Sequence, residues 1–191
     1  MQPALEERHI EVTPVAENVQ RTFDPRGRSM PTVYIETSIV SYLRQRPSGQ
    51  VVAAARQWLT RRWWDCERHK YELVTSQYVL DEAARGDPTQ AAERLQALAD
   101  IPLLQLTPEI AHIGQEILSR AILPSTAQVE ALHIAAVAFH ETDYLLTWNC
   151  RHIANAQILP KIREFLSELG CAVPMVCTPE EMVGEDENEP R

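Results

Sequence analysis

The sequence predicts an α/β fold with three layers, α/β/α, and a central parallel sheet. Short apolar segments of strand length alternate with longer helical segments about five times along the chain. No hairpin turn joins one strand segment to the next, so the strands are expected to run parallel and to be connected through helices. With 191 residues, 45% of them hydrophobic, the chain is long enough to bury one sizeable core.

The first strand is expected at residues 32–35, with the sequence TVYI. This segment is apolar and rich in β-branched and aromatic residues, and one carboxylate, Glu36, follows it directly. Further segments of strand character lie at residues 71–75, 102–106, 143–149 and 174–177.

Helices are expected between these strands because apolar residues recur there at helical spacing. Asp87 followed by Pro88 caps and opens one helix, and Ser125 with Gln128 forms a capping box for the most apolar one. Thr178 opens a final turn with a capping box of its own. The expected helices span residues 39–46, 51–69, 76–85, 87–100, a segment that opens at 107, 126–140 and 152–169.

Three parts of the chain are expected: a flexible extension over residues 1–30, a folded domain over 31–179 and an acidic tail over 180–191. The tail holds six acidic residues and one Arg, so much of the net charge of −9 lies outside the domain, and charge alone does not exclude a nucleic-acid partner. The sequence has no membrane span, no secretory signal near its start and no paired-cysteine motif. A cytoplasmic protein with reduced thiols is the expectation.

Polar residues from four distant segments are expected to meet at one edge of the sheet. The carboxyl ends of parallel strands share an edge, and Glu36 and Asn149 each follow an apolar strand. Glu130 lies near the start of the helix that leads into the strand before Asn149, and Glu82 (or its neighbour Asp81) lies in the helix after the second strand. Oxygen ligands of this kind suit Mg²⁺ or Mn²⁺.

Each of these residues also has a purely structural explanation. Glu36 and Asn149 could each cap the helix that follows, and Glu82 could be a solvated residue on a helix of mixed polarity. Glu130 interrupts an otherwise apolar helix, and His133, one turn further on, is expected to pack or hydrogen-bond beside it. His152 is expected to cap a turn.

Four segments of the chain carry a resemblance to a known family: MPTVYIETSIVSYL, SQYVLDEAARGDP, VEALHIAAVAFHETDYLLTWNCRHIAN and CTPEEMVG. Together they resemble the PIN-domain family, in particular its VapC-like toxin nucleases. The resemblance runs from about Met30 to Gly184 and is most specific at ALHIA and DYLLTWNCRHIAN. It implies a small α/β/α domain whose clustered acids bind Mg²⁺ or Mn²⁺ and cleave RNA, as the toxin of a type II toxin–antitoxin pair.

The resemblance also assigns roles to the candidate residues. It implies that Glu36, Glu130 and Asn149 hold the metal ion and that Glu82 assists directly or through water; Thr37, Ser38 and Thr147 stand where family members place hydroxyls. Family members usually carry Asp at the positions of Glu36 and Glu130. A domain with weakened catalysis that binds RNA or a protein is therefore the alternative.

Basic residues and tryptophans are interleaved between residues 44 and 70. Seven of the 18 basic residues fall there, around Trp58, Trp63 and Trp64. Such a pattern is typical of a track for single-stranded RNA, but it also suits a solvated helix face with an apolar stripe. Exposed tryptophans there could instead form an interface for a homodimer or for an antitoxin.

Overall fold

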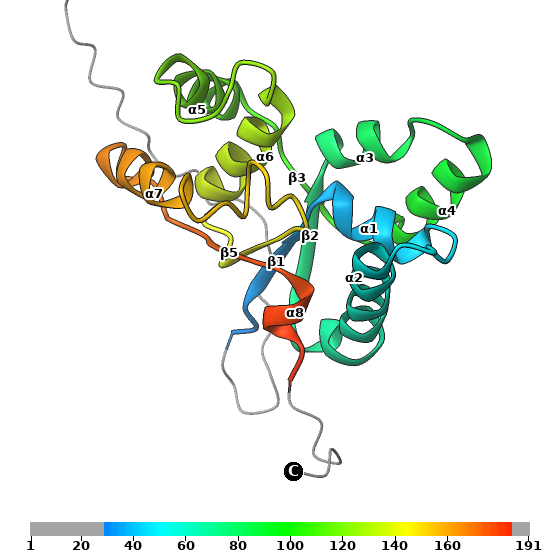
Figure 1. Ribbon diagram of the computed structural model, residues 1–191. Coiled ribbons are helices and arrows are strands. Elements are labelled where there is room, and N and C mark those ends of the chain that lie inside the picture. Colours follow the sequence, from blue (N-terminus) through cyan, green and yellow to red (C-terminus); the bar gives the residue numbers. More distant parts are fainter. Residues whose placement is uncertain (1–28, 185–191) are drawn as a thin grey trace, which may run out of the picture.

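The structure is a computed structural model that describes residues 29–184, and it shows a parallel sheet between two layers of helices (Figure 1). The predicted α/β/α fold is thereby confirmed. Of the predicted extension over 1–30 and the predicted tail over 180–191, residues 1–28 and 185–191 lie outside the described residues, whereas residues 180–182 belong to the last helix. The five strands, in the spatial order β3-β2-β1-β4-β5, are β1 (Thr32–Ile35), β2 (Glu72–Ser76), β3 (Leu103–Leu104), β4 (Tyr144–Leu146) and β5 (Met175–Cys177).

The helices divide into two groups by the face of the sheet that they cover. Right-handed crossovers place the connections β1–β2 and β2–β3 on one face of the sheet. The connections β3–β4 and β4–β5 lie on the other face, as Figure 1 shows. The first group is α1 (Thr37–Arg44), α2 (Val51–Arg62), α3 (Gln77–Ala83) and α4 (Pro88–Leu98). The second is α5 (Pro108–Ser119), α6 (Gln128–Phe139) and α7 (Leu159–Glu168), and the chain then forms α8 (Pro179–Met182).

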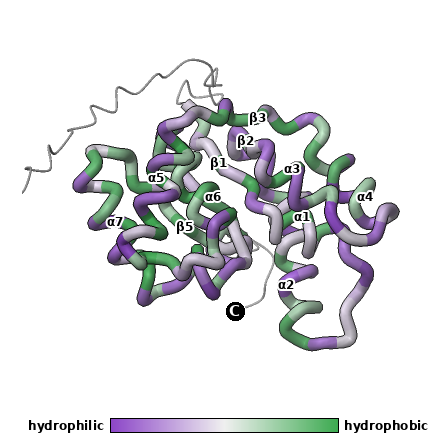
Figure 2. The backbone as a smooth tube through the Cα atoms, turned by 90° about the horizontal axis from the view of Figure 1, so that it is seen from above, coloured by the Kyte–Doolittle hydropathy of each residue, from purple (hydrophilic) through white to green (hydrophobic). Residues whose placement is uncertain are grey.

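The core lies between these layers. All four residues of β1 are buried because strands flank it on both sides and helices cover both faces. Seen from above, α5 and α7 alternate hydrophilic and hydrophobic positions, as expected of helices with one face in solvent (Figure 2). α6 is buried along most of its length, which agrees with its prediction as the most apolar helix. Among the described residues, no helix is both long and apolar enough to cross a membrane.

Two predicted helix caps form and one does not. Asp87 accepts a hydrogen bond from the Gln90 backbone N–H at 3.0 Å, and the Glu181 carboxylate accepts one from the Thr178 N–H at 2.8 Å. The capping box predicted at Ser125 is wrong, because α6 begins at Gln128 without a side-chain cap.

The helix predicted over 51–69 changes geometry at its end. α2 stops at Arg62, and a π-helical turn, η1 (Trp63–Glu67), and a 3₁₀ turn, η2 (Arg68–Lys70), follow it. A π turn is wider than an α turn, and here it accompanies the burial of two consecutive indoles, with Trp63 0% and Trp64 5% exposed.

The segment after β4 also differs from the prediction. The strand expected over 143–149 ends at Leu146, because the Asn149 N–H donates to the Thr147 hydroxyl at 2.8 Å and turns the chain out of the sheet. The helix expected from residue 152 begins only at Leu159. Asn155 accepts from the Gln157 N–H at 2.9 Å and so holds a turn instead of a helix, and Pro160 then stands in the first turn of α7.

The strand order positions the site. The chain proceeds from β1 to β2 and β3 on one side, and returns to β4 and β5 on the other, so the order reverses between β1 and β4. In open α/β sheets, ligands bind beyond the carboxyl ends of the strands at such a switch point. Glu36 follows β1 there, and Thr147 follows β4.

Candidate metal site

Glu36 caps a helix and is also a buried carboxylate at the end of β1. It caps α1, since its Oε2 atom accepts from the Ser38 N–H at 3.1 Å. The same oxygen accepts from the Thr147 hydroxyl at 2.7 Å and from the Ser38 hydroxyl. The side chain is only 5% exposed, so these donors offset the cost of burying a carboxylate. Among the described residues, nothing donates a hydrogen bond to Oε1.

Glu82 reaches the same region from α3. Its Oε2 atom accepts from the Thr37 hydroxyl at 2.6 Å and contacts His133 Nε2 at 3.0 Å. Within the described part of the chain, its Oε1 atom likewise receives no hydrogen bond. Burial raises the pKa of this carboxyl, but the hydrogen bonds from His133 and Thr37 more than offset that effect, so the pKa lies below its ordinary value.

His133 is held from behind by the core. Its Nδ1 atom lies 2.8 Å from the Tyr34 hydroxyl, which lies 2.6 Å from the Ser76 hydroxyl. Burial raises the pKa of the Tyr34 phenol, so this group keeps its proton. A histidine ring with one nitrogen fixed by a hydrogen bond presents the other nitrogen in a fixed direction, which is how protein metal sites orient their ligands.

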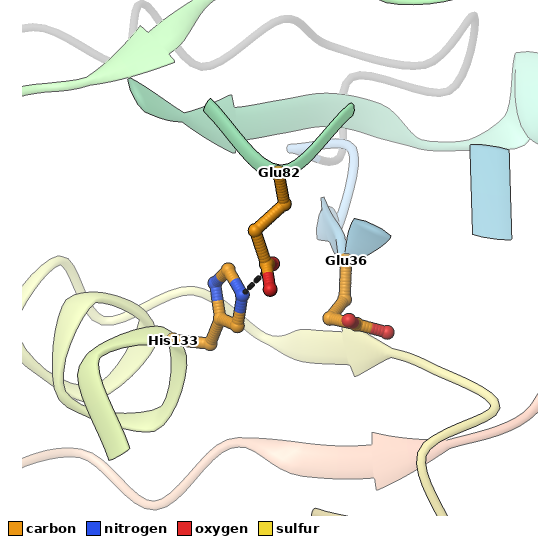
Figure 3. Close-up of side chains that lie close together, drawn as sticks. All are labelled: Glu36, Glu82 and His133. Carbon is orange, nitrogen blue, oxygen red and sulfur yellow. Dashed lines mark hydrogen bonds and ion pairs between the residues drawn. The ribbon is translucent and has the colours of Figure 1, made fainter. Parts of the chain in front are cut away.

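Glu36, Glu82 and His133 form a group that could hold a metal ion. One ligand atom of each residue lies within 4.8 Å of the others, and the three side chains come from three different elements (Figure 3). The group combines carboxylate oxygens with one imidazole nitrogen. Below, these three residues are called the metal group.

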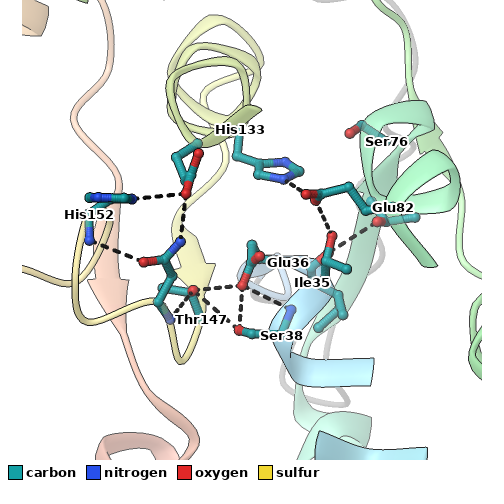
Figure 4. Close-up of polar contacts among 12 residues, drawn as sticks. Ile35, Glu36, Ser38, Ser76, Glu82, His133, Thr147 and His152 are labelled. Atoms are coloured by element: carbon teal, nitrogen blue, oxygen red, sulfur yellow. Dashed lines mark hydrogen bonds and ion pairs between the residues drawn. The ribbon is translucent and has the colours of Figure 1, made fainter. Parts of the chain in front are cut away.

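Glu130 and Asn149 form a second group beside it, together with His152. Glu130 Oε1 lies 2.9 Å from His152 Nδ1 and 3.3 Å from Asn149 Nδ2, and Asn149 Oδ1 accepts from the His152 N–H at 3.1 Å. Burial raises the pKa of Glu130, but the bonds from His152, the backbone and Asn149 outweigh it, so the pKa is lowered. Thr147 connects the groups, because it donates to Glu36 and accepts from the Asn149 N–H (Figure 4).

The structure thus divides the four residues predicted from the sequence. Glu36 and Glu82 belong to the metal group, whereas Glu130 and Asn149 belong to the neighbouring group. The role of Glu130 and Asn149 as ligands stays a prediction.

The predicted place of His133 is wrong, because its Nε2 atom contacts Glu82 and not Glu130. The side chain is 1% exposed and points into the core towards Tyr34, away from the more open position of Glu130. Sequence reasoning therefore missed His133 as a member of the site. The available signal was a titratable side chain on a helix otherwise apolar on nearly all sides, which needs a polar partner when buried.

Comparisons with known proteins add no relative to this description. A scan against protein-family models, a search of curated proteins and a search of solved structures each found no match to the chain. The sheet topology and the side chains that converge at its switch point are therefore the features that indicate a function.

Proposed function

We propose that the chain is a metal-dependent endoribonuclease of the PIN type, similar to VapC toxins. The observation that carries the proposal is the metal group at the topological switch point of a parallel sheet, where such folds bind their ligands. The resemblance of the segments around the metal group and around Glu130 and Asn149 supports RNA as the substrate and phosphodiester hydrolysis as the reaction.

The donor set of the metal group fits a divalent cation. Carboxylate oxygens suit Mg²⁺ and Mn²⁺, whereas an imidazole suits transition metals. Because His133 is part of the group, we place Mn²⁺ ahead of Mg²⁺. When bound, such an ion stabilises negative charge on a scissile phosphate and makes a water molecule more acidic.

The surrounding hydroxyls leave oxygens available for that ion. Ser38 and Thr147 bond only Oε2 of Glu36, and Thr37 bonds only Oε2 of Glu82. Each carboxylate is therefore oriented through one oxygen and offers the other. This arrangement reduces the rearrangement needed when a cation binds.

The contact between His133 and Glu82 implies a proton shift along a short chain of groups. When neutral His133 donates from Nε2 to Glu82, its Nδ1 accepts from the Tyr34 hydroxyl, which in turn accepts from Ser76. If Nε2 held a metal ion, the ring proton would have to lie on Nδ1, and the hydrogen bond from Nε2 to Glu82 would be lost. Tyr34 would then accept from Nδ1 and donate to Ser76, so the two hydrogen bonds behind the ring would be kept.

Glu130 and Asn149 are proposed to complete the site from the other side. Thr147 already links them to Glu36, and the lowered pKa keeps Glu130 ionised at neutral pH. An ionised carboxylate next to the reacting phosphate can orient the attacking water through a hydrogen bond. On the same resemblance, the chain is proposed to be the toxin of a type II pair, with an antitoxin or a second copy of the chain as its partner.

One observation favours the alternative of a domain that binds RNA or a protein without cutting it. Glu82 and Glu130 each already have a histidine partner, at 3.0 Å from His133 and 2.9 Å from His152, so two of the three carboxylates have polar partners without a cation.

The test is a cleavage assay with Mn²⁺ and Mg²⁺ on single-stranded RNA. The wild-type protein is expected to cleave with either ion and faster with Mn²⁺. Glu36→Gln should lower the rate by at least about 100-fold, since even outer partners of metal ligands contribute about 10- to 100-fold. Glu164→Gln is the matched control, because Glu164 is exposed on α7.

Two results would decide against the proposal. Equal cleavage by wild type and Glu36→Gln would identify a contaminating nuclease. RNA binding by the wild type without cleavage under either metal would establish the alternative.

A further inference from the structure

Arg56, on α2, is held in place by two aromatic rings near the metal group. Its guanidinium lies over the Trp148 ring at 5.1 Å and over the Tyr42 ring at 5.8 Å, and Nη1 donates to the Tyr42 hydroxyl at 3.2 Å. Nη2 makes only a weak contact, 3.9 Å to Cys150 Sγ. Cation–π contacts with two rings and the hydrogen bond to Tyr42 therefore hold the guanidinium in position.

No acidic residue in the described part of the chain neutralises this charge. Lys70 pairs with Glu67, and Arg120 pairs with Glu116 and Glu168, but Arg56 makes no such pair. A guanidinium has five N–H donors, and Arg56 uses one of them in a firm hydrogen bond, to Tyr42. The side chain is half-buried, so its remaining donors are accessible from only a limited range of directions. The guanidinium of Arg56 is therefore held in position, while most of its N–H donors make no firm hydrogen bond within the described part of the chain.

The position of Arg56 connects it to the metal group through two elements. Tyr42 lies four residues after Ser38 on α1, so slightly more than one helical turn, or about 6 Å of rise, separates the two. Trp148 contacts Ser38 directly, because its backbone N–H donates to the Ser38 hydroxyl at 2.8 Å. Ser38 in turn donates to Glu36 of the metal group. The Trp148 indole is fixed as well, since its Nε1–H donates to Thr60 at 2.7 Å.

The burial of the aromatic residues indicates which part of a nucleic acid meets this surface. Trp148 is 6% exposed, and Trp63 and Trp64 are buried in the core, so none of the three offers a face on which a base could stack. This result corrects the predicted RNA track around the tryptophans, of which only Trp58 is exposed. What the surface beside the metal group offers is a positive, planar donor group. Such a group binds phosphate oxygens.

We propose that Arg56 is a phosphate-binding residue, which holds a backbone phosphate of a single-stranded nucleic acid next to the phosphate at the metal group. The identity of this ligand as RNA rests on the proposed function. Binding of this kind would place the substrate backbone along α1, with the scissile phosphate at Glu36 and a neighbouring phosphate at Arg56.

The test measures RNA affinity without cleavage, in EDTA, with an oligonucleotide of ~10 nucleotides. Arg56→Ala should weaken binding by about tenfold, the usual effect of losing a hydrogen bond to a charged group. It should also flatten the dependence of log K on log salt concentration by about 0.7, the value for one phosphate contact on a single strand. Arg56→Lys, which keeps the charge, should keep the slope and lose part of the affinity.

Arg61→Ala is the matched control, because Arg61 lies on the same helix and donates to the Gln45 carbonyl at 3.3 Å instead of stacking near the site. It should leave affinity and slope unchanged. Equal effects of Arg56→Ala and Arg61→Ala would indicate a diffuse positive surface and would overturn the inference. Unchanged affinity in Arg56→Ala would also overturn it.

A second measurement on the wild-type chain does not depend on the stability of a variant or on catalysis. Inorganic phosphate should shift the Arg56 Nε–H resonance in an NMR titration and leave that of Arg61 in place. If the resonance shifts but the protein cleaves no RNA, the phosphate site is supported and the proposed function is refuted. If the protein cleaves RNA but the Arg56 resonance responds to neither phosphate nor RNA, the proposed function is supported and the phosphate site is refuted.

Discussion

Two glutamate–histidine pairs lie side by side in this molecule, and they differ in how firmly the protein holds them. The contact distances are nearly equal, 3.0 Å for Glu82 with His133 and 2.9 Å for Glu130 with His152. The His133 side chain is 1% exposed, however, whereas that of His152 is 16% exposed. His133 is also fixed from behind by Tyr34, while His152 lies in the turns between β4 and α7.

The difference in burial makes His133 a preorganised side chain and His152 an adaptable one. A buried ring with both nitrogens engaged can change its tautomer but not its position, which is what a metal ligand requires. A ring in a turn can move with the chain around it. The comparison therefore predicts that the inner pair determines metal binding and folding stability, and that the outer pair determines neither.

Among the substitutions in the two pairs, His133→Ala should change the protein most. The substitution leaves a cavity in the core and removes hydrogen-bond partners from Glu82 and Tyr34, so it should destabilise the protein by about 2–4 kcal/mol. Urea unfolding monitored by circular dichroism measures this change. The increase in melting temperature that Mn²⁺ gives the wild type should disappear. A variant that unfolds like the wild type would show that the buried pair contributes nothing to stability.

The next effect is that of Tyr34→Phe, which removes one hydroxyl from behind His133. We expect a loss of about 1–2 kcal/mol in unfolding free energy, since the ring stays and a hydrogen bond is lost. Mn²⁺ affinity should fall by about tenfold, the usual effect of an outer partner of a metal ligand, as measured by isothermal titration calorimetry.

Tyr78→Phe serves as the control for that variant. The Tyr78 ring also packs against His133, with the ring centroids 6.4 Å apart, but no hydrogen bond joins its hydroxyl to the histidine. It should therefore bind Mn²⁺ like the wild type. Equal losses in both variants would mean that ring packing orients His133, and not the Tyr34 hydroxyl.

The same comparison shows how far the sequence could predict the site. Glu36 was predictable because a short apolar strand ends at one carboxylate, and topology then carried Glu82 to the same edge of the sheet. The hydrogen-bond partner of His133 was not predictable. Helical spacing relates His133 to Glu130 on its own helix and says nothing about a glutamate on the other side of the sheet. Contacts between layers depend on how far each side chain reaches, and no local pattern records that distance.

The fold shows a similar limit. The order and type of the elements follow from the hydrophobic periodicity, and the structure confirms them. The late start of α7 and the π turn after α2 were not predicted, because each depends on tertiary structure: one on the turn that Asn155 holds, the other on two indoles entering the same core. Differences of this kind fall at the boundaries of elements, where local propensity is weakest.

His152→Ala should change the protein least, and it tests directly whether the two pairs differ in function. The pair with Glu130 is partly exposed, so its loss should reduce the free energy of unfolding by no more than about 1 kcal/mol. Mn²⁺ affinity should stay within about twofold of the wild type, because His152 contacts Glu130 and Asn149 and no member of the metal group. Calorimetric titration beside His133→Ala measures both values under one condition. If instead His152→Ala loses Mn²⁺ binding as completely as His133→Ala, the ion must contact Glu130 and Asn149, the ligands predicted from the sequence. The metal would then sit between the two pairs, and the inner group alone would not define the site.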